Sequence, residues 1–462
     1  KVRIEHSVSK GFYCEIDGCN QSLELPLIFT ICDKMREIIA ADLPFRRDKV
    51  LTIDAVKIFQ NSGYHDRARL FITRPKLYTS VYYLSDISDY FFGSLVPSTG
   101  YLKVFDLVKY YDGMLLRIPK RFNPEEVEDL VLQNKMFDIF QEYKNWVEIL
   151  GVESVAAIND EVKKGNSSEL IKISEALHEK KVARIADKIH NSPNNVKVVL
   201  ISGPSSSGKT TFAKRLAVHL KVNGLKPYTI SLDNYFVNRE DTPRDEHGEY
   251  DFEALEALDI TYFNNDLIKL LNGEEVNLPK FSFEQGKRFF DNTKLKIEDN
   301  GIIVIEGIHA LNPKLTPLIP ADKKFKVYIS ALTSLSIDGI NRIPTTDNRL
   351  IRRIVRDFRY RGYSAYDTIS RWESVRRGED KNIFPYQEEA DEMFNSALLL
   401  EFGILKSYAE PILQEVPSNK PEYDEAMRLL KFLSYFSPIS DKEVPPTSII
   451  REFLGGSTFS YK

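Results

Sequence analysis

One short stretch constrains this 462-residue chain more than any other: ISGPSSSGKTT, from Ile201 to Thr211. It contains the pattern GxxxxGK[ST] directly after the apolar run VKVVLIS. The glycines let the loop curl so that its N–H groups face phosphate oxygens, and the helix that follows adds its positive end. A strand, this loop and a helix in that order predict a nucleotide-phosphate site. The pattern leaves open whether the phosphate is transferred, hydrolysed or only sensed.

The residues of the loop have expected roles. Lys209 would reach the β- and γ-phosphates of ATP, and the Thr210 hydroxyl would bind Mg²⁺, so we expect both as cofactors. The cofactor-binding set is Gly203, Pro204, Ser205, Ser206, Ser207, Gly208, Lys209, Thr210 and Thr211.

The chain reads as four sections. Residues 1–122 mix short strand-like runs (GFYCEI, KLYTSVYYL, GMLLRIP) with helical pieces, which is typical of an α+β domain. Residues 123–192 form a predicted helical connector. In residues 193–415, three more buried-strand runs (KPYTISLD, GIIVIEGI, KFKVYIS) are separated mostly by helical patterns, which predicts an α/β domain with a parallel sheet flanked by helices. Residues 416–462 are a last helix and a tail.

The connector has recognisable helix ends. Asn123 is a capping residue, Pro124 suits a first turn, and Glu126 can reach back toward the cap, so we expect a helix from there to Gly151. A second helix is expected from Ser168 to His190.

The composition argues against several classes of function. A net charge of −4 gives no domain-wide basic footprint, so nucleic acid is not the expected partner. No apolar run reaches the roughly 18 residues that a membrane span needs. The three cysteines, Cys14, Cys19 and Cys32, make no disulfide framework, and with His6 their spacing fits no common zinc motif. We expect a cytoplasmic protein whose oligomeric state the sequence leaves open.

Two carboxylates stand at predicted strand ends, where ligands gather in open α/β sheets. Glu306 ends the run IIVIE, just before Gly307, and is the expected partner of Thr210 at the metal; the alternative is a strand-end glutamate that faces solvent. Asp233 follows TISL, 24 residues after Lys209, and is the expected base for an acceptor hydroxyl, with Tyr235 and Phe236 beside it as an aromatic wall. A turn or cap aspartate is the alternative for Asp233.

The segment RLIRRIVRDFRYRG is unusually basic. Arg349, Arg352, Arg353 and Arg356 fall on one helical face, where like charges repel. One interpretation is a solvated face. The other is a lid that closes over the γ-phosphate and neutralises charge in the transition state.

Taken together, six stretches resemble the uridine kinase and phosphoribulokinase family of P-loop kinases: GPSSSGKTT, SLDNYF, YDFEAL, LPKFSF, IVIEGIHAL and RLIRRIVRDFRYRG, in that order. The resemblance covers residues 196–415. It implies that Asp233 is the catalytic base, that Asp251 binds sugar hydroxyls, and that Phe281, with Phe283 in the same motif, lines the nucleoside pocket. It also implies that the lid arginines are Arg353, Arg356 and Arg361.

The departures from this family concern the acceptor. Phe281 replaces a tyrosine of uridine–cytidine kinases, and Gly286 aligns with a base-reading histidine. Tyr363 aligns with an arginine and Arg371 with a glutamine, both near the acceptor. Loss of polar groups that read a base lowers selectivity strongly, so uridine is not secure as the substrate.

The first section resembles the second additional domain of threonyl-tRNA synthetases through GFYCEI, and bacterial nucleoside-kinase-like proteins join such a domain to this kinase. The HxxxH pair used there for editing is missing, so we do not expect that activity.

Our main hypothesis is an ATP- and Mg²⁺-dependent kinase of a hydroxyl on a nucleoside or sugar-like small molecule. The alternatives are a kinase of another hydroxyl metabolite and a nucleotide-dependent RNA-binding or regulatory protein.

Overall fold

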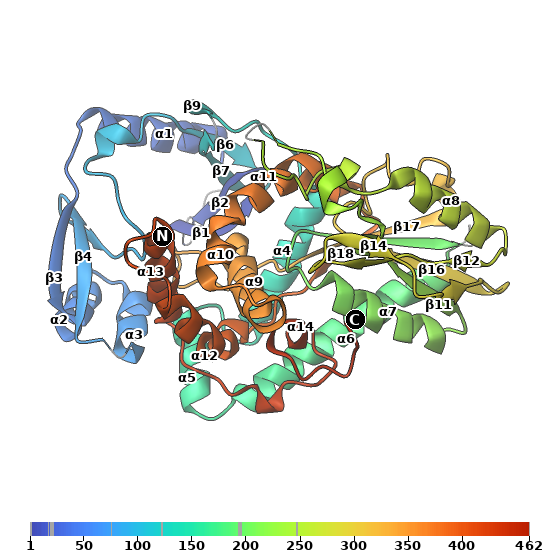
Figure 1. Cartoon of the computed structure of the whole chain (residues 1–462). Coiled ribbons are helices and arrows are strands. Elements are labelled where there is room, and N and C mark those ends of the chain that lie inside the picture. Colours follow the sequence, from blue (N-terminus) through green and yellow to red (C-terminus); the bar gives the residue numbers. More distant parts are fainter. Residues whose placement is uncertain are drawn as a thin grey trace. The chain divides into compact units, whose positions relative to one another are not determined.

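The computed structural model describes residues 2–16, 18, 23–74, 76–121, 123–192, 196–245 and 248–461 (Figure 1). By packing, these residues form two compact units. Unit 1 comprises Lys1–Ser168, Thr333–Asn348 and Phe402–Ser440, and unit 2 comprises Glu169–Leu332, Arg349–Glu401 and Asp441–Lys462. The chain therefore passes from one unit to the other several times. The four sections expected along the sequence stay a prediction.

Unit 1 has the antiparallel strands and helices of an α+β fold, as predicted for the first section. One sheet has the order β1-β2-β7-β6 and another the order β3-β4-β5. The strands are β1 Val2–Val8, β2 Gly11–Ile16, β3 Arg46–Leu51, β4 Tyr78–Leu84, β5 Ile87–Asp89, β6 Asp106–Tyr110, β7 Gly113–Arg117, β8 Pro119–Lys120 and β9 Asn123–Val127. The helices are α1 Leu25–Ala40, α2 Thr52–Asn61, α3 His65–Thr73, α4 Asn134–Ile149, α5 Val155–Lys163, α12 Glu401–Gln414 and α13 Glu422–Leu433.

The helix predicted to start at Asn123 is wrong in its first part. Asn123–Val127 is strand β9, which pairs with β8 in a small hairpin, and the helix begins at Asn134. Leu130 and Val131, which extended the expected apolar stripe, are about half exposed. The helix therefore begins only where its apolar side chains find a core.

Two of the cysteines lie in the core of unit 1. Cys14 and Cys32 are buried and free. Cys19 lies outside the described residues.

Unit 2 is built on a five-stranded parallel sheet of order β11-β16-β10-β17-β18, seen in Figure 1. Strands β10 and β16 are buried along their whole length, as expected for inner strands covered on both faces. The sheet strands are β10 Val198–Ser202, β11 Lys226–Ser231, β16 Gly301–Glu306, β17 Lys324–Ser330 and β18 Glu392–Asn395. The small strands are β12 Val276–Asn277, β13 Lys280–Ser282, β14 Lys287–Phe289 and β15 Lys294–Leu295. The helices are α6 Ser167–His190, α7 Lys209–Val222, α8 Ile260–Leu271, α9 Thr345–Arg361, α10 Ala365–Ser370, α11 Trp372–Asn382 and α14 Arg451–Leu454.

Helices cover both faces of this sheet. On one face Leu200 and Ile305 pack in a cluster with Phe263 of α8. On the other face the ring of Phe212 in α7 lies 4.7 Å from that of Phe394 in β18. The α/β fold expected from the sequence is therefore confirmed, and all five strands point their carboxyl ends toward the same edge.

Among the described helices, none combines the length and the apolar character needed to cross a membrane.

Candidate functional site

The phosphate loop joins the carboxyl end of β10 to the amino end of α7. A Cβ on Gly203 would lie 1.9 Å from the carbonyl oxygen of Ile329, and Gly208 has a φ of +86°. Both positions therefore need glycine. Ser206 also has a positive φ, of 59°, so the loop is tightly curled in the way that the sequence pattern predicts.

Lys209 folds back over this loop. Its Nζ donates to the carbonyl oxygen of Pro204 at 3.0 Å. Burial lowers the pKa of Lys209, while the negative charges of Glu306 and Asp233 act to raise it. The ammonium group is thus close to the two carboxylates that the sequence assigns to the metal and to the acceptor.

Glu306 ends β16 and is only 6% exposed, so it is not a strand-end carboxylate in solvent. Its Oε1 accepts a hydrogen bond from the Ser231 hydroxyl at 2.7 Å. Burial raises the pKa of Glu306 to about 7, and the charge of Asp233 adds to the effect. The ionised form of a carboxyl group that is costly to ionise in the empty protein is stabilised by a bound cation.

The surroundings of Glu306 fit magnesium. Thr210 lies one residue after Lys209 and offers a hydroxyl, and hard divalent cations prefer such oxygen ligands. Nowhere in the described residues do three His, Cys, Asp or Glu side chains group as a metal site. Mg²⁺ often takes one or two protein ligands and completes its shell with phosphate and water, so two ligands are enough.

Asp233 lies in the short helical turn Leu232–Tyr235 that follows β11. Its charge acts on Lys209, Glu306, Glu253 and Arg361. Asp233 therefore lies close to several charged groups at the carboxyl edge of the sheet.

Glu253 belongs to the same charged cluster, and the sequence reasoning missed it. Burial raises its pKa to about 7, against the positive charges of Arg353 and Lys209 that act to lower it. Its Oε2 is buried and has no hydrogen-bond partner among the described residues. Asp251, predicted to bind hydroxyls, accepts the Glu253 amide at 3.1 Å and so sets the turn that holds Glu253. The sequence feature that could have indicated Glu253 is its place in the motif YDFEAL, two residues after Asp251.

Three phenylalanine rings form an aromatic group beside Asp233. Phe236, Phe281 and Phe283 lie with ring centroids 5.3–6.2 Å apart. Tyr235 does not belong to this group: it is 1% exposed and its hydroxyl donates to Asp266 at 3.1 Å. Of the expected wall, Phe236 therefore takes part and Tyr235 does not, because the backbone turn points the Tyr235 ring into the core.

The arginines predicted to form a lid meet at one carboxylate. Arg353, Arg356 and Arg361 each lie within 3.4 Å of an Asp357 oxygen. Burial alone would raise the pKa of Asp357, but these three charges hold it below its usual value. Arg353 also donates to the Ser205 hydroxyl at 2.8 Å, which links the helix to the phosphate loop.

Arg361 is the member of this group nearest the aromatic rings. Its guanidinium lies 5.5 Å from the centroid of Phe283. The charge of Arg356, together with burial, lowers the pKa of Arg361 to about 10, while Asp233 acts to raise it. An anion placed among these cations would relieve their mutual repulsion.

The other two arginines of the predicted helical face, Arg349 and Arg352, are buried, which rules out the solvated-face interpretation for them. Arg349 is 1% exposed, pairs with Glu379 and donates to the Ser205 carbonyl at 3.2 Å. Arg352 is fully buried, pairs with Glu401 and donates to the Ser206 carbonyl at 3.4 Å. Both side chains therefore hold the backbone of the phosphate loop through its carbonyl oxygens.

The positions that depart from the family pattern have structural reasons. Gly286 has a φ of +66°, and a Cβ there would lie 2.8 Å from Nε of Arg239. A base-reading side chain at this position would be strained and would clash. Arg371 lies over the ring of Tyr363 at 4.6 Å, so these two residues contact each other.

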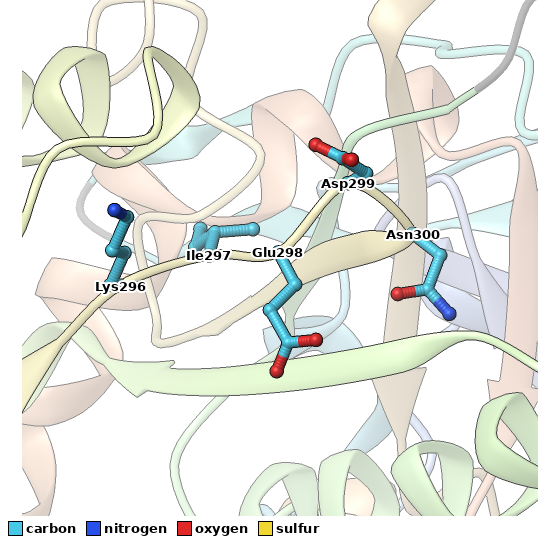
Figure 2. Close-up of a pocket in the computed structure, with 5 residues that line it drawn as sticks. All are labelled: Lys296, Ile297, Glu298, Asp299 and Asn300. Carbon is cyan, nitrogen blue, oxygen red and sulfur yellow. The ribbon is translucent and has the colours of Figure 1, made fainter.

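One surface pocket lies outside this cluster. Figure 2 shows it lined by the successive residues Lys296, Ile297, Glu298, Asp299 and Asn300. This loop precedes β16, whose six residues span about 20 Å before reaching Glu306. The pocket therefore lies at the amino end of the strand, away from the predicted site residues.

Comparison with known proteins agrees with the motifs. The model of the Phosphoribulokinase / Uridine kinase family matches residues 198–398. The chain is 30% identical over 205 residues to the uridine kinase of Saccharomyces cerevisiae, covering 43% of this chain and 36% of that protein. It covers 33% of the uridine kinase of Schizosaccharomyces pombe, so it spans about a third of the length of these two curated relatives.

A bacterial relative is covered far more completely. The uridine kinase of Borrelia duttonii is 31% identical over 205 residues, which are 42% of this chain and 84% of that protein. A solved structure titled as a possible uridine kinase from Bacillus stearothermophilus is 20% identical, covers 43% of this chain and 89% of that one, and has a TM-score of 0.29. On the family match and the extent of the Borrelia alignment, the chain belongs to the phosphoribulokinase/uridine kinase family.

Proposed function

We propose that the chain transfers the γ-phosphoryl group of ATP to a hydroxyl of a nucleoside or related sugar-like molecule. The observation that carries this proposal is the grouping of Lys209, Glu306 and Asp233 at the carboxyl ends of β10, β16 and β11. A cation for phosphate, a carboxylate for the metal and a second carboxylate for the acceptor are the parts that phosphoryl transfer needs.

The reaction balances with these groups. The acceptor hydroxyl gives its proton to the Asp233 carboxylate while its oxygen forms a bond to the γ-phosphorus. The bond between the γ-phosphorus and the bridging oxygen breaks, and ADP leaves with the electron pair. Thr210 and Glu306 would hold Mg²⁺, which when bound supplies positive charge to the phosphates. Lys209, Arg356 and Arg361 would neutralise the charge that develops on the transferred group.

The acceptor would lie between Asp233 and the rings of Phe236, Phe281 and Phe283. Glu253, Asp251 and Arg353 supply hydrogen-bonding groups for hydroxyls beside an apolar wall. The aromatic wall supports a ring-bearing acceptor, while Gly286 removes one polar group that would read a pyrimidine. We therefore propose an acceptor chosen by its sugar hydroxyls more than by its base, and treat uridine as one member of the class to test.

The test is an ADP-release screen over nucleosides, sugars and sugar phosphates, followed by Asp233→Asn with the best acceptor. Loss of a general base costs about 10²–10⁴-fold in kcat. Asp299→Asn is the matched control, because it makes the same chemical change at the opposite end of β16. Lys209→Ala should abolish transfer with little effect on folding. Near-normal turnover of Asp233→Asn would show that the roles are assigned wrongly.

A further inference from the structure

A segment outside the family match lies directly on the phosphate loop. Residues 441–461, here called the 441–461 segment, belong to unit 2 and follow residue 398, where the family match ends. Ile449 of this segment is fully buried, and its Cγ2 lies 2.4 Å from where a Cβ on Gly208 would be. The glycine that the loop needs for its curl is thus also needed for this packing.

A carboxylate of the segment binds the start of α7. Oε2 of Glu452 accepts hydrogen bonds from the Thr211 amide at 3.2 Å and from the Thr211 hydroxyl at 2.6 Å. The Tyr461 hydroxyl lies 3.0 Å from the same threonine oxygen. Thr211 is the third residue of α7, and its N–H is one of those that the helix itself leaves without a partner.

The same N–H group has a second expected use. The loop amides and the first amides of the helix cradle the α- and β-phosphates in this kind of site. Lys209 reaches the β- and γ-phosphates, so the amide two residues further along faces the α-phosphate side. A carboxylate and a phosphate cannot both occupy that place. The Glu452 charge also acts on Lys209 and Glu306, so it lies close enough to disfavour an anion in the site.

We propose that the 441–461 segment is a built-in competitor of the nucleotide: Glu452 occupies the phosphate position at Thr211 and must release it when ATP binds. This inference rests on the proposed function, because it assumes that the loop binds ATP. It assigns a regulatory contact to residues that the family comparison does not reach.

Release requires only part of the segment to move. Ile449, Ile450, Phe453 and Leu454 are buried and anchor it. Arg451 donates to Asp441 at 2.8 Å and to the Val444 carbonyl at 2.8 Å, which holds the short helix α14 in place. Rotation of the Glu452 side chain and departure of Tyr461 are enough to free Thr211.

The experiment compares ATP binding to the full chain and to Glu452→Gln by calorimetry, with ATP in excess Mg²⁺. Glutamine keeps the size of the side chain and an acceptor oxygen but loses the negative charge. The affinity of Glu452→Gln for ATP should therefore be roughly tenfold higher than that of the unchanged chain, the equivalent of one charge-assisted hydrogen bond. Glu443→Gln is the matched control: it removes the same charge from an exposed position of the same segment and should leave affinity unchanged.

A purely structural cap predicts a different result. Thermal stability of the free protein would fall in Glu452→Gln while its affinity for ATP stayed equal to that of the unchanged chain, and this outcome overturns the proposal. If neither protein binds ATP, the proposed function fails and this inference with it. If the unchanged chain binds and Glu452→Gln binds equally or more weakly, only the competitor role fails.

A second measurement needs no variant. In the unchanged chain, hydrogen exchange of the amides of residues 457–461, the part that departs with Tyr461, should become faster when ATP and Mg²⁺ are added. Slower or unchanged exchange in the ATP-bound protein contradicts the proposal.

Discussion

At the scale of single residues, the candidate site contains two carboxylates that burial makes costly to ionise. Glu253 and Glu306 both have pKa values raised to about 7 chiefly by burial, and both lie near Lys209. Carboxyl groups whose pKa is raised in this way favour chemistry in which a cation or a hydroxyl enters the site, because either partner offsets the cost of ionising them. Glu253 matters most for tests because its buried Oε2 has no hydrogen-bond partner among the described residues.

Glu253 makes the stability of the free protein depend on pH. Its folded pKa of about 7 lies above the unfolded value of about 4.5, so the folded state holds a proton that the unfolded chain releases. The resulting stability is fully present below pH 4.5 and is lost as the pH rises through 7. Denaturant unfolding should give about 1 kcal/mol more stability at pH 6 than at pH 8 from this group, and Glu253→Gln should remove that part.

The control for this prediction is Glu256→Gln, an exposed glutamate of the next turn. It should keep the pH dependence of the unchanged chain. Equal pH slopes for the unchanged chain and Glu253→Gln would contradict the assignment.

The sequence could predict residues whose place is fixed by the ends of strands. Asp233 and Glu306 each follow an apolar run, and the parallel sheet brings those ends together. Glu253 could not be found in this way, because its position depends on a loop held by Asp251 and on close contact with α11, where Gly378 leaves room for it. Tyr235 and Phe236 are adjacent aromatics, and only the turn between them decides which one enters the core.

At the scale of elements, helix α9 combines two kinds of arginine. Arg352 is buried against Glu401 and supports the loop, whereas Arg356 lies at the partly exposed cluster around Asp357. Periodicity alone placed them on one face. The partner of Arg352, Glu401, comes from α12, far along the chain, whereas the partner of Arg356, Asp357, lies on α9 itself. This is why the sequence could predict a basic helix but not which of its arginines supports the loop and which lies at Asp357.

Arg352→Met and Arg356→Met should therefore differ. The first leaves Glu401 buried without its partner and should cost about 3–5 kcal/mol of stability, measured by denaturant unfolding. The second should change stability by less than about 1 kcal/mol and lower kcat in the ADP-release assay. Equal destabilisation by the two variants would contradict the separation of roles.

The β13–β14 hairpin gives a second test at this scale. Gly286→Ala places a Cβ at a positive φ and within 2.8 Å of Arg239, whose guanidinium donates to the Phe283 carbonyl. Gly273→Ala imposes the same kind of φ, +77°, with nothing within 4 Å of the added carbon. Both should lose about 1 kcal/mol from backbone strain, and Gly286→Ala should lose measurably more in thermal unfolding. Equal losses would mean that the contact with Arg239 does not constrain position 286.

At the scale of the whole molecule, the 441–461 segment is part of the core of unit 2. Ending the chain after Ser440 removes the buried side chains of Ile449, Ile450, Phe453 and Leu454. Each contributes about 1.5–3 kcal/mol, which together rivals the total stability of a typical protein. We expect that truncated chain to lose its near-ultraviolet circular dichroism, whereas a chain ended after Gly456 keeps it. A folded chain ending at Ser440 would contradict this account of the segment.

The way in which the backbone passes repeatedly between the two units has a consequence for inheritance. Residues 333–348 and 402–440 belong to unit 1 although they lie between pieces of unit 2. No single contiguous stretch of coding sequence specifies either unit. Recombination that exchanged one stretch with a relative would deliver an incomplete unit and disrupt the other, so the two units are expected to be gained, lost and replaced together.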